Sequence, residues 1–135
     1  MLKLSKKSEY ALMAVRYLAI NSNGKYFTAR DIAQYYDIPY ELVAKVLQQL
    51  VKKDLVHSSQ GVRGGYALAR SSEHISLMEI ISAIEENYNI TNCMNENSSQ
   101  IDCTHFDCCM IRDPLIKVQI EIDKVLKNMK VNQIL

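Results

Sequence analysis

Residues 28–51 read TARDIAQYYDIPYELVAKVLQQLV, and this stretch decides the fold. Thr28 is followed three residues later by Asp31, a spacing that resembles a capping box and predicts the start of a short helix. Pro39 suits the first turn of a second helix and keeps the residue before it out of the helical region. From about Tyr40 the apolar residues recur three and four apart. Two short helices joined by a tight turn predict a helix-turn-helix.

The segments on either side of this stretch extend it to a winged helix. Apolar residues recur with a helical period from Ser5 until Asn23-Gly24 breaks the pattern. Beyond the helix-turn-helix, residues 55–58 and 66–69 are β-rich, and three of the four glycines lie in the connection between them. Glycine permits the positive φ angles of a hairpin tip, so we expect a β-ribbon there. The predicted fold class is mainly α with a small β-wing.

The second half is predicted to hold two more helices and a long connection. Ser76 and Glu79 have the spacing of a capping box, which predicts a fourth helix that ends at about Glu86. Residues 87–107 are polar and without periodicity, and connections of that length are usually functional or disordered. Asp113-Pro114 predicts the start of a long C-terminal helix, with a start a few residues earlier, at the cysteines, as the alternative.

The long helix carries apolar residues at heptad spacing. These are Leu115, Val118, Ile122, Val125 and Met129. So narrow a stripe suits packing against a partner subunit, and helix-turn-helix modules commonly pair on two-fold sites, so we expect a homodimer. The alternative is a helix that docks on its own domain. We therefore expect a winged helix-turn-helix DNA-binding domain over residues 1–70, and a sensory cysteine loop with dimerisation helices over residues 71–135, within one continuous structural unit.

The net charge of +1 conceals two opposed halves. Residues 1–70 hold eleven Lys and Arg against five Asp and Glu, whereas residues 71–135 hold five against ten. A basic excess that coincides with a helix-turn-helix predicts DNA binding, although scattered lysines can also form only a solvated face. We expect the third helix and the wing tip to read bases and contact phosphates. The predicted DNA contacts are Thr28, Tyr40, Glu41, Lys45, Gln48 and Arg63.

The chain's four cysteines all lie between the predicted fourth helix and the long C-terminal helix, at Cys93, Cys103, Cys108 and Cys109. Without an export signal, disulfides explain them poorly, because the cytosol is reducing. Thiolates gathered on a loop suit a soft metal centre, and both zinc and an iron-sulfur cluster are chemically allowed. The missing CxxC pair weakens a structural zinc site, and unliganded thiols remain the alternative.

Other classes of protein are disfavoured. No stretch approaches twenty apolar residues and no secretion signal is recognisable, so we expect a cytoplasmic protein without a membrane partner. No GxSxG motif, phosphate loop or paired acid and base is present in the sequence, so an enzyme is not expected.

Three motifs carry a resemblance to a known family: residues 6–12 (KKSEYAL), residues 61–68 (GVRGGYAL), and residues 80–85 (IISAIE) before a three-cysteine loop. The chain resembles, over nearly its whole length, the Rrf2 type of winged-helix transcription regulators, which includes IscR, NsrR, RirA and CymR. The resemblance implies a homodimer whose long helices cross, and two DNA-binding heads. In the cluster-binding members it also implies an iron-sulfur cluster held by three loop cysteines, whose loss or change alters operator affinity.

The resemblance implies Cys93, Cys103 and Cys109 as ligands of a [2Fe-2S] or [4Fe-4S] cluster. Five residues separate Cys103 from Cys109, as is common in the family, whereas the nine residues between Cys93 and Cys103 make a wider gap than usual. The histidine that completes the site in IscR corresponds to Arg112, which stays protonated and cannot ligate. In NsrR the fourth ligand is an acidic residue of the first helix of the other subunit, and Glu9 occupies that position.

Cys108 is an alternative ligand, although adjacent cysteines bind one cluster only with strain, and His105 is a further competitor. The sequence thus predicts a dimeric DNA-binding regulator, more readily a repressor than an activator, whose operator affinity depends on a cluster sensing iron, redox state or nitric oxide. One rival is a cluster-free member of the family, controlled by thiol oxidation or a partner protein. A rival of another class is a redox protein that carries a metal or cluster.

Overall fold

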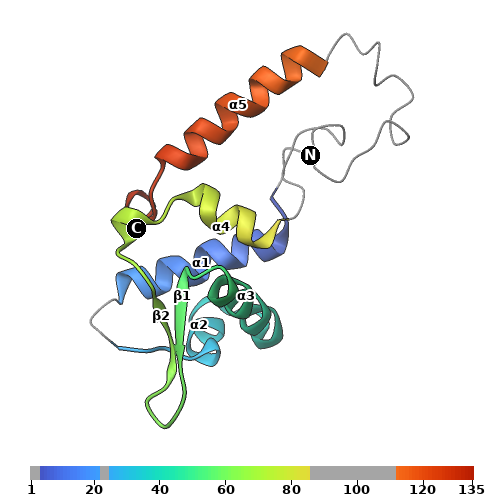
Figure 1. The fold of residues 1–135 in the computed structure, drawn as a ribbon. Coiled ribbons are helices and arrows are strands. Elements are labelled where there is room, and N and C mark those ends of the chain that lie inside the picture. The colour runs from blue at the N-terminus through green and yellow to red at the C-terminus, as the bar shows by residue number, and fades with distance from the viewer. Residues whose placement is uncertain (1–3, 22–24, 86–111) are drawn as a thin grey trace.

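The computed structural model describes residues 4–21, 25–85 and 112–135. In these ranges lie five α-helices, a two-stranded antiparallel sheet and two short 3-10 helices (Figure 1). The α-helices are α1 (Lys6–Ile20), α2 (Ala29–Tyr36), α3 (Tyr40–Lys52), α4 (Leu77–Ile84) and α5 (Arg112–Asn128). The strands are β1 (Val56–Ser59) and β2 (Gly65–Leu68), and the 3-10 helices are η1 (Ser72–His74) and η5 (Val131–Gln133). This architecture confirms the predicted fold class.

The helix starts follow from local hydrogen bonds. Thr28 and Asp31 form the complete capping box at the start of α2, as the sequence predicts. Asp37 ends α2 in the left-handed conformation with φ +54°, and the extended Pro39 directly precedes α3. At the start of α1, the Ser5 side chain accepts a hydrogen bond from the Ser8 backbone. These caps satisfy backbone donors that a helix leaves free at its first turn.

The core draws on both halves of the chain. Helices α1, α2 and α3 bury their apolar faces together, with residues such as Val15, Ile32 and Leu47 fully inaccessible. Ile75 and Val131, from the second half, are also fully buried within this same cluster. Burial of apolar surface is the main favourable term in folding, so residues far apart in sequence stabilise one core. We call α1–α3, the two strands and this core the head.

The wing is a hairpin in which Val56 pairs with Leu68 and Ser59 with Gly65. Both strands are displaced by one residue from the predicted ranges, and Gly65 belongs to β2 rather than to the turn. Its φ of +145° and its closeness to the Phe27 carbonyl, 2.5 Å from where a Cβ would stand, both require glycine. Gly65 is thus a site of close backbone approach.

Helix α4 is fixed at both ends. The capping box of Ser76 and Glu79 is present, as predicted. The chain beside it pairs with the end of α5, because the Leu77 amide donates to the Met129 carbonyl and the Val131 amide donates to the Ile75 carbonyl, both at 2.9 Å. Helix α4 ends at Ile84, two residues before the predicted end, because Glu85 is extended and its carboxylate binds the start of α1.

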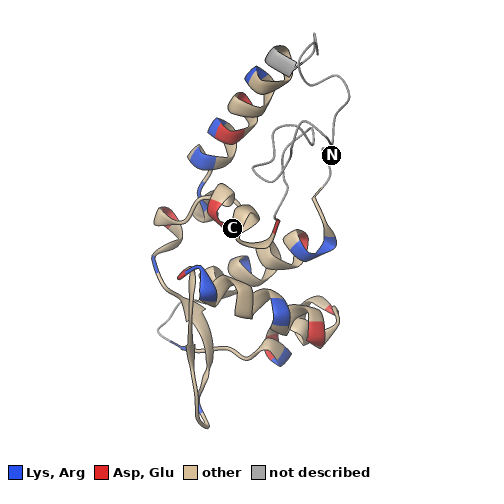
Figure 2. Ribbon diagram, turned by 45° about the vertical axis from the view of Figure 1, so that its right-hand side comes forward, with Lys and Arg blue, Asp and Glu red and all other residues tan. Residues whose placement is uncertain are grey.

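Charge is distributed differently from what the two halves of the sequence suggest. Four of the ten acidic residues of the second half, Glu86, Glu96, Asp102 and Asp107, lie in residues 86–111, a range without Lys or Arg. In the remainder of that half the two signs nearly balance, and both occur along α5 (Figure 2). The acidic excess therefore belongs mainly to the segment that carries the cysteines.

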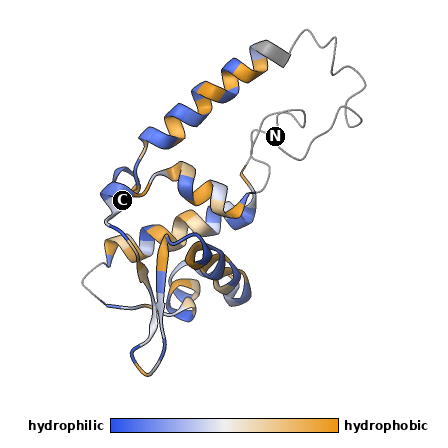
Figure 3. Cartoon of the chain, in the orientation of Figure 1, coloured by the Kyte–Doolittle hydropathy of each residue, from blue (hydrophilic) through white to orange (hydrophobic). Residues whose placement is uncertain are grey.

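Helix α5 extends away from the end of the molecule that bears the wing (Figure 1), and hydrophobic residues alternate with hydrophilic ones along its length (Figure 3). Of its predicted heptad residues, Leu115 and Ile122 are partly buried. Val118 is 47% exposed, Val125 58%, and Met129, directly after the helix, 38%. We call these three side chains the α5 strip. None of the helices in the described ranges is long and apolar enough to cross a membrane.

Candidate nucleic-acid interface

Helix α3 presents a polar stripe to solvent. Glu41, Lys45 and Gln48 follow one another at spacings of four and three, so they lie on one face, and all are exposed. The opposite face holds Val46 and Leu50, which are fully buried against the core. Packing thus leaves free the three side chains that the sequence assigns to base reading.

Tyr40, at the first position of α3, is exposed and lies beside α2. The Arg30 guanidinium stands 5.4 Å from the centre of its ring, a cation-π arrangement. Arg30 is absent from the predicted contacts because the two residues belong to different helices, and no spacing in the sequence indicates that they meet. The pair places a positive charge at the start of the α3 stripe.

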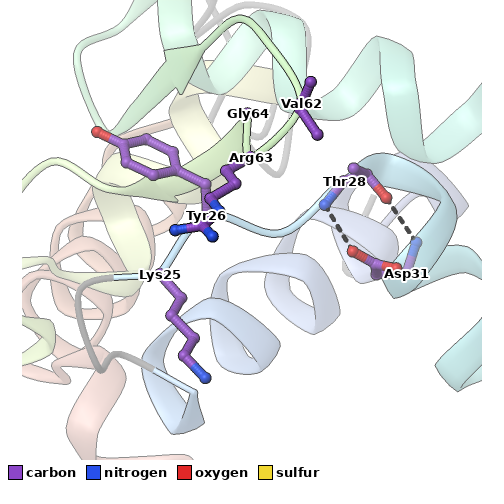
Figure 4. Close-up of a pocket in the computed structure, with 7 residues that line it drawn as sticks. All are labelled: Lys25, Tyr26, Thr28, Asp31, Val62, Arg63 and Gly64. Carbon is purple, nitrogen blue, oxygen red and sulfur yellow. Dashed lines mark hydrogen bonds between the residues drawn. The ribbon is translucent and has the colours of Figure 1, made fainter.

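The wing is joined to the segment before α2 by two backbone hydrogen bonds. The Phe27 amide donates to the Tyr66 carbonyl at 3.0 Å, and the Tyr66 amide donates to the Phe27 carbonyl at 2.7 Å. These bonds bring the wing tip and the start of α2 to a common open cavity of ≈ 580 Å³ (Figure 4). The cavity is lined by Lys25, Tyr26, Thr28, Asp31, Val62, Arg63 and Gly64.

The electrostatics of this wing cavity favour an anion. Lys25, from the segment before α2, and Arg63, from the wing tip, supply two positive charges. Among the described residues that line the cavity, the carboxylate is that of Asp31, which accepts from the Thr28 amide at 2.9 Å, while the Thr28 hydroxyl accepts from the Asp31 amide at 3.1 Å (Figure 4). The predicted residues Thr28 and Arg63 are therefore brought together. The sequence indicates Lys25 only as part of the basic excess, because its place at the cavity depends on the pairing of Phe27 with Tyr66.

The predicted metal ligands divide between described and undescribed parts of the chain. Cys93, Cys103, Cys108, Cys109 and the competitor His105 lie outside the described residues. Within residues 4–21, 25–85 and 112–135, no three His, Cys, Asp or Glu side chains are grouped to hold a metal ion.

Glu9 lies in the first turn of α1, with 41% of its side chain exposed. Its carboxylate accepts a hydrogen bond from the Lys6 ammonium at 3.1 Å, and this bond raises the pKa of Lys6. Exposed ion pairs of this kind are weak, so the carboxylate is available to another cation.

The start of α1 is held against the residue that precedes the cysteine segment. Glu85 Oε1 accepts from the Ser5 amide at 3.0 Å and from the hydroxyl of the fully buried Ser8 at 2.8 Å. Partial burial opposes ionisation of Glu85, but hydrogen bonds from Ser5 and Ser8 outweigh it and hold its pKa below the usual value. Glu9 therefore directly follows Ser8, which contacts Glu85, the residue from which residues 86–111 begin.

Comparison with known proteins agrees with this architecture. The family model described as Rrf2, iron-dependent transcriptional regulator, matches residues 4–135. A candidate HTH-type transcriptional regulator of Haemophilus influenzae is 35% identical over 107 residues, which are 77% of this chain and 71% of that protein. The HTH-type transcriptional regulator NsrR of Shouchella clausii is 29% identical over 98 residues, which are 73% of this chain and 66% of that one.

Solved structures have the same fold. The structure of CymR, the global cysteine regulator of B. subtilis, superposes with a TM-score of 0.78 at 22% sequence identity, covering 99% of this chain and 96% of that one. At that identity the likeness establishes the fold, whereas the family model establishes descent over almost the whole sequence. The chain therefore belongs to the Rrf2 family of DNA-binding transcriptional regulators.

Proposed function

We propose that this protein is a dimeric regulator that binds operator DNA through the α3 stripe and the wing cavity, and that an iron-sulfur cluster controls its affinity. The observation that carries the DNA function is the pair of hydrogen bonds between Phe27 and Tyr66, which joins the wing to the segment before α2 and brings Lys25 and Arg63 to one cavity. Glu41, Lys45 and Gln48 would read base edges in the major groove. Lys25, Thr28 and Arg63 would contact phosphates, with Arg63 also able to enter the minor groove.

Dimerisation is supported by the α5 strip. Exposed apolar side chains aligned on one face of a long helix are unfavourable in water and are commonly covered by a partner. A second α5 is the fitting occupant, because the strip is narrow and has heptad spacing. Pairing of two α5 helices would carry two heads, each able to address one half-site of a two-fold operator.

The donor set fits a soft metal centre. Cys93, Cys103 and Cys109 would supply three thiolates, and Glu9 of the other subunit would supply a carboxylate that forms an exposed ion pair with Lys6. The cluster, when bound, supplies iron that can be oxidised or can react with small molecules. The role of the chain is to gather the thiolates and to hold Glu9 at the start of α1, so that ligation affects the placement of the head.

A second candidate retains DNA binding but uses thiol oxidation in place of a cluster. The adjacent Cys108 and Cys109 favour it, because one thiol of such a set can serve as a resolving partner for an oxidised one. On anaerobic purification the cluster candidate predicts a coloured protein that contains iron and sulfide, whereas the thiol candidate predicts a colourless one.

The test is to purify the protein anaerobically, record its visible absorption and determine iron and sulfide. Duplexes that it binds are then selected from a randomised pool, and their affinity is measured with iron present and after chelation. We expect a coloured protein that contains iron and sulfide and changes affinity on chelation. A colourless protein that still binds a selected duplex would support the thiol candidate. Failure to select any duplex in either state would contradict the DNA function and favour a cluster carrier.

A further inference from the structure

The contact between Glu85 and the first turn of α1 joins the two ends of a long chain segment. One carboxylate oxygen, Oε1, accepts both hydrogen bonds, although Ser5 and Ser8 precede Glu85 by 80 and 77 positions. The Ser5 hydroxyl in turn accepts from the Ser8 amide at 3.2 Å. We call these three residues the Glu85 latch.

We propose that Glu85 is a positioning residue that couples the cysteine-bearing segment to the DNA-binding head through the first turn of α1. The inference rests on the proposed function, because it specifies how a change at the cysteines reaches the DNA. Glu85 is the last described residue before residues 86–111 and is extended rather than helical. Its side chain therefore fixes the point from which that segment leaves the head.

The latch has a direct structural route to α3. Helix α1 begins at the latch and packs along α3, with Ala14 and Val15 buried in the same cluster as Val46 and Leu47. Close-packed interiors transmit displacement because they contain few voids. A shift of the first turn of α1 would therefore move the buried side of α3, whose other side carries Lys45 and Gln48.

The other end of α4 is held separately. Arg70, after the wing, donates to the Glu79 carboxylate at 3.0 Å, and Leu77 pairs with Met129. Helix α4 is thus tied to the wing and to the end of α5 at its start, and to α1 at its end. Loss of the latch would leave the start of α4 in place and release α1 from the origin of the cysteine segment.

Three variants separate the hydrogen bonds from the charge. Glu85→Ala removes the acceptor, whereas Glu85→Gln keeps an amide oxygen that can accept from both serines. Ser8→Ala removes one donor and only a single oxygen atom from a fully buried site. Glu73→Ala is the matched control, since it makes the same charge change at an exposed glutamate of η1.

The experiment measures the ratio of the dissociation constants for a wild-type-selected duplex in two states of the full-length protein. One state is loaded anaerobically with ferrous iron and sulfide, and the other is stripped with a chelator. Coupling between two sites commonly amounts to about 5- to 150-fold. We expect Glu85→Ala to bring this ratio close to one, Ser8→Ala to lower it partly, and Glu85→Gln and Glu73→Ala to keep it within about twofold of wild type.

A second readout needs neither metal nor DNA. In the stripped protein, hydrogen exchange at the amides of the first turn of α1 should be faster in Glu85→Ala than in wild type, and Glu85→Gln should restore slow exchange.

The outcomes distinguish this inference from the proposed function. A wild-type ratio of one contradicts both. A wild-type ratio far from one that Glu85→Ala leaves unchanged contradicts the Glu85 role alone. The same holds if Glu85→Ala weakens binding equally in both states, because the latch would then be structural only. If Glu85→Ala does not fold, an unchanged ratio in Ser8→Ala overturns the inference.

Discussion

Gly65 stands so close to Phe27 that a Cβ atom on the glycine would lie 2.5 Å from the Phe27 carbonyl oxygen. This approach is what allows the next residue, Tyr66, to exchange two hydrogen bonds with Phe27. The wing is consequently attached to the segment before α2 by backbone hydrogen bonds. The relative placement of Arg63 and Thr28 thus depends on Gly65, which is not itself among the residues that line the wing cavity.

We predict that Gly65→Ala destabilises the protein by at least about 2 kcal/mol, because it combines an unfavourable φ with a backbone overlap. Gly61→Ala is the matched control: it also has a positive φ, +111°, but its added Cβ meets nothing within 4 Å. We expect that variant to lose about 1 kcal/mol. Urea denaturation measures both, and equal losses would show that the contact with Phe27 is unimportant.

The wing cavity should contribute phosphate contacts. Lys25→Ala and Arg63→Ala should each reduce the slope of log affinity against log salt concentration by about 1, the amount expected for one phosphate contact. Lys124→Ala removes an equal charge on α5, where Lys124 pairs with Glu121, and should leave the slope unchanged. Fluorescence anisotropy with a selected duplex over a salt series decides between these results. A slope altered only in Lys124→Ala would place the DNA against α5 and contradict phosphate contacts at the wing cavity.

The cysteines should divide into two groups. Replacing Cys93, Cys103 or Cys109 with serine should abolish visible absorption and bound iron after anaerobic purification, because serine is a poor ligand for soft iron. Cys108→Ser should retain both. A colourless Cys108→Ser protein would make Cys108 a ligand.

Glu9→Ala should leave a cluster that a chelator removes faster than from wild type. Lys6→Ala is its control, because it breaks the ion pair with Glu9 and preserves the carboxylate. Equal rates of iron loss in wild type and Glu9→Ala would exclude Glu9 from the site.

The α5 strip should hold the dimer together. Val125→Glu places a charge at the centre of the strip and should shift the protein toward monomer in light scattering at micromolar concentration. Ile120→Glu is the comparison, since Ile120 is 48% exposed but lies on nearly the opposite face of α5. A monomeric Ile120→Glu alongside a dimeric Val125→Glu would assign the interface to the other face.

Stability should depend on the ionisation of Glu79. Partial burial opposes ionisation, but hydrogen bonds from Ser76 and Arg70 and the charges of Arg70 and Lys130 hold the pKa of Glu79 below its ordinary value of 4.5. A carboxyl with a lowered folded-state pKa stabilises the fold above its unfolded-state pKa, and this contribution is lost as the pH falls through the folded value.

The wild-type free energy of unfolding should therefore fall as the pH drops below about 4.5, and Glu79→Gln should show a smaller fall over that interval together with lower stability at pH 7. Denaturation between pH 7 and 3 measures both. Parallel curves for the two proteins would contradict the assignment.

The parts of the fold that the sequence predicted rest on short-range contacts. Thr28 with Asp31 and Ser76 with Glu79 are three residues apart, so their capping boxes can be recognised from the chain alone. The exposed stripe of α3 also follows from spacing, because burying one face of a helix determines which residues remain outside.

The remainder depends on contacts between distant residues. The sequence predicts Gly65 in a turn, because glycine is usual there, whereas the structure places it in β2 next to Phe27, which is distant in sequence. The sequence predicts Glu85 within the fourth helix, because nothing near it in sequence indicates its hydrogen bonds to Ser5 and Ser8. The stacking of Arg30 on Tyr40 likewise requires the two helices to be placed first.

Val131 has a consequence for how the protein is made. Synthesis proceeds from the N-terminus, and domains generally fold as units as they emerge. The core of the head contains Val131, which lies beyond α5 in the chain, so α1–α3 cannot complete their packing on the ribosome before α5 has been synthesised. A nascent chain interrupted within α5 would lack Val131, and complete burial of such a side chain contributes about 1.5–3 kcal/mol. By the time the core of the head is complete, the helix that bears the α5 strip has therefore already been synthesised.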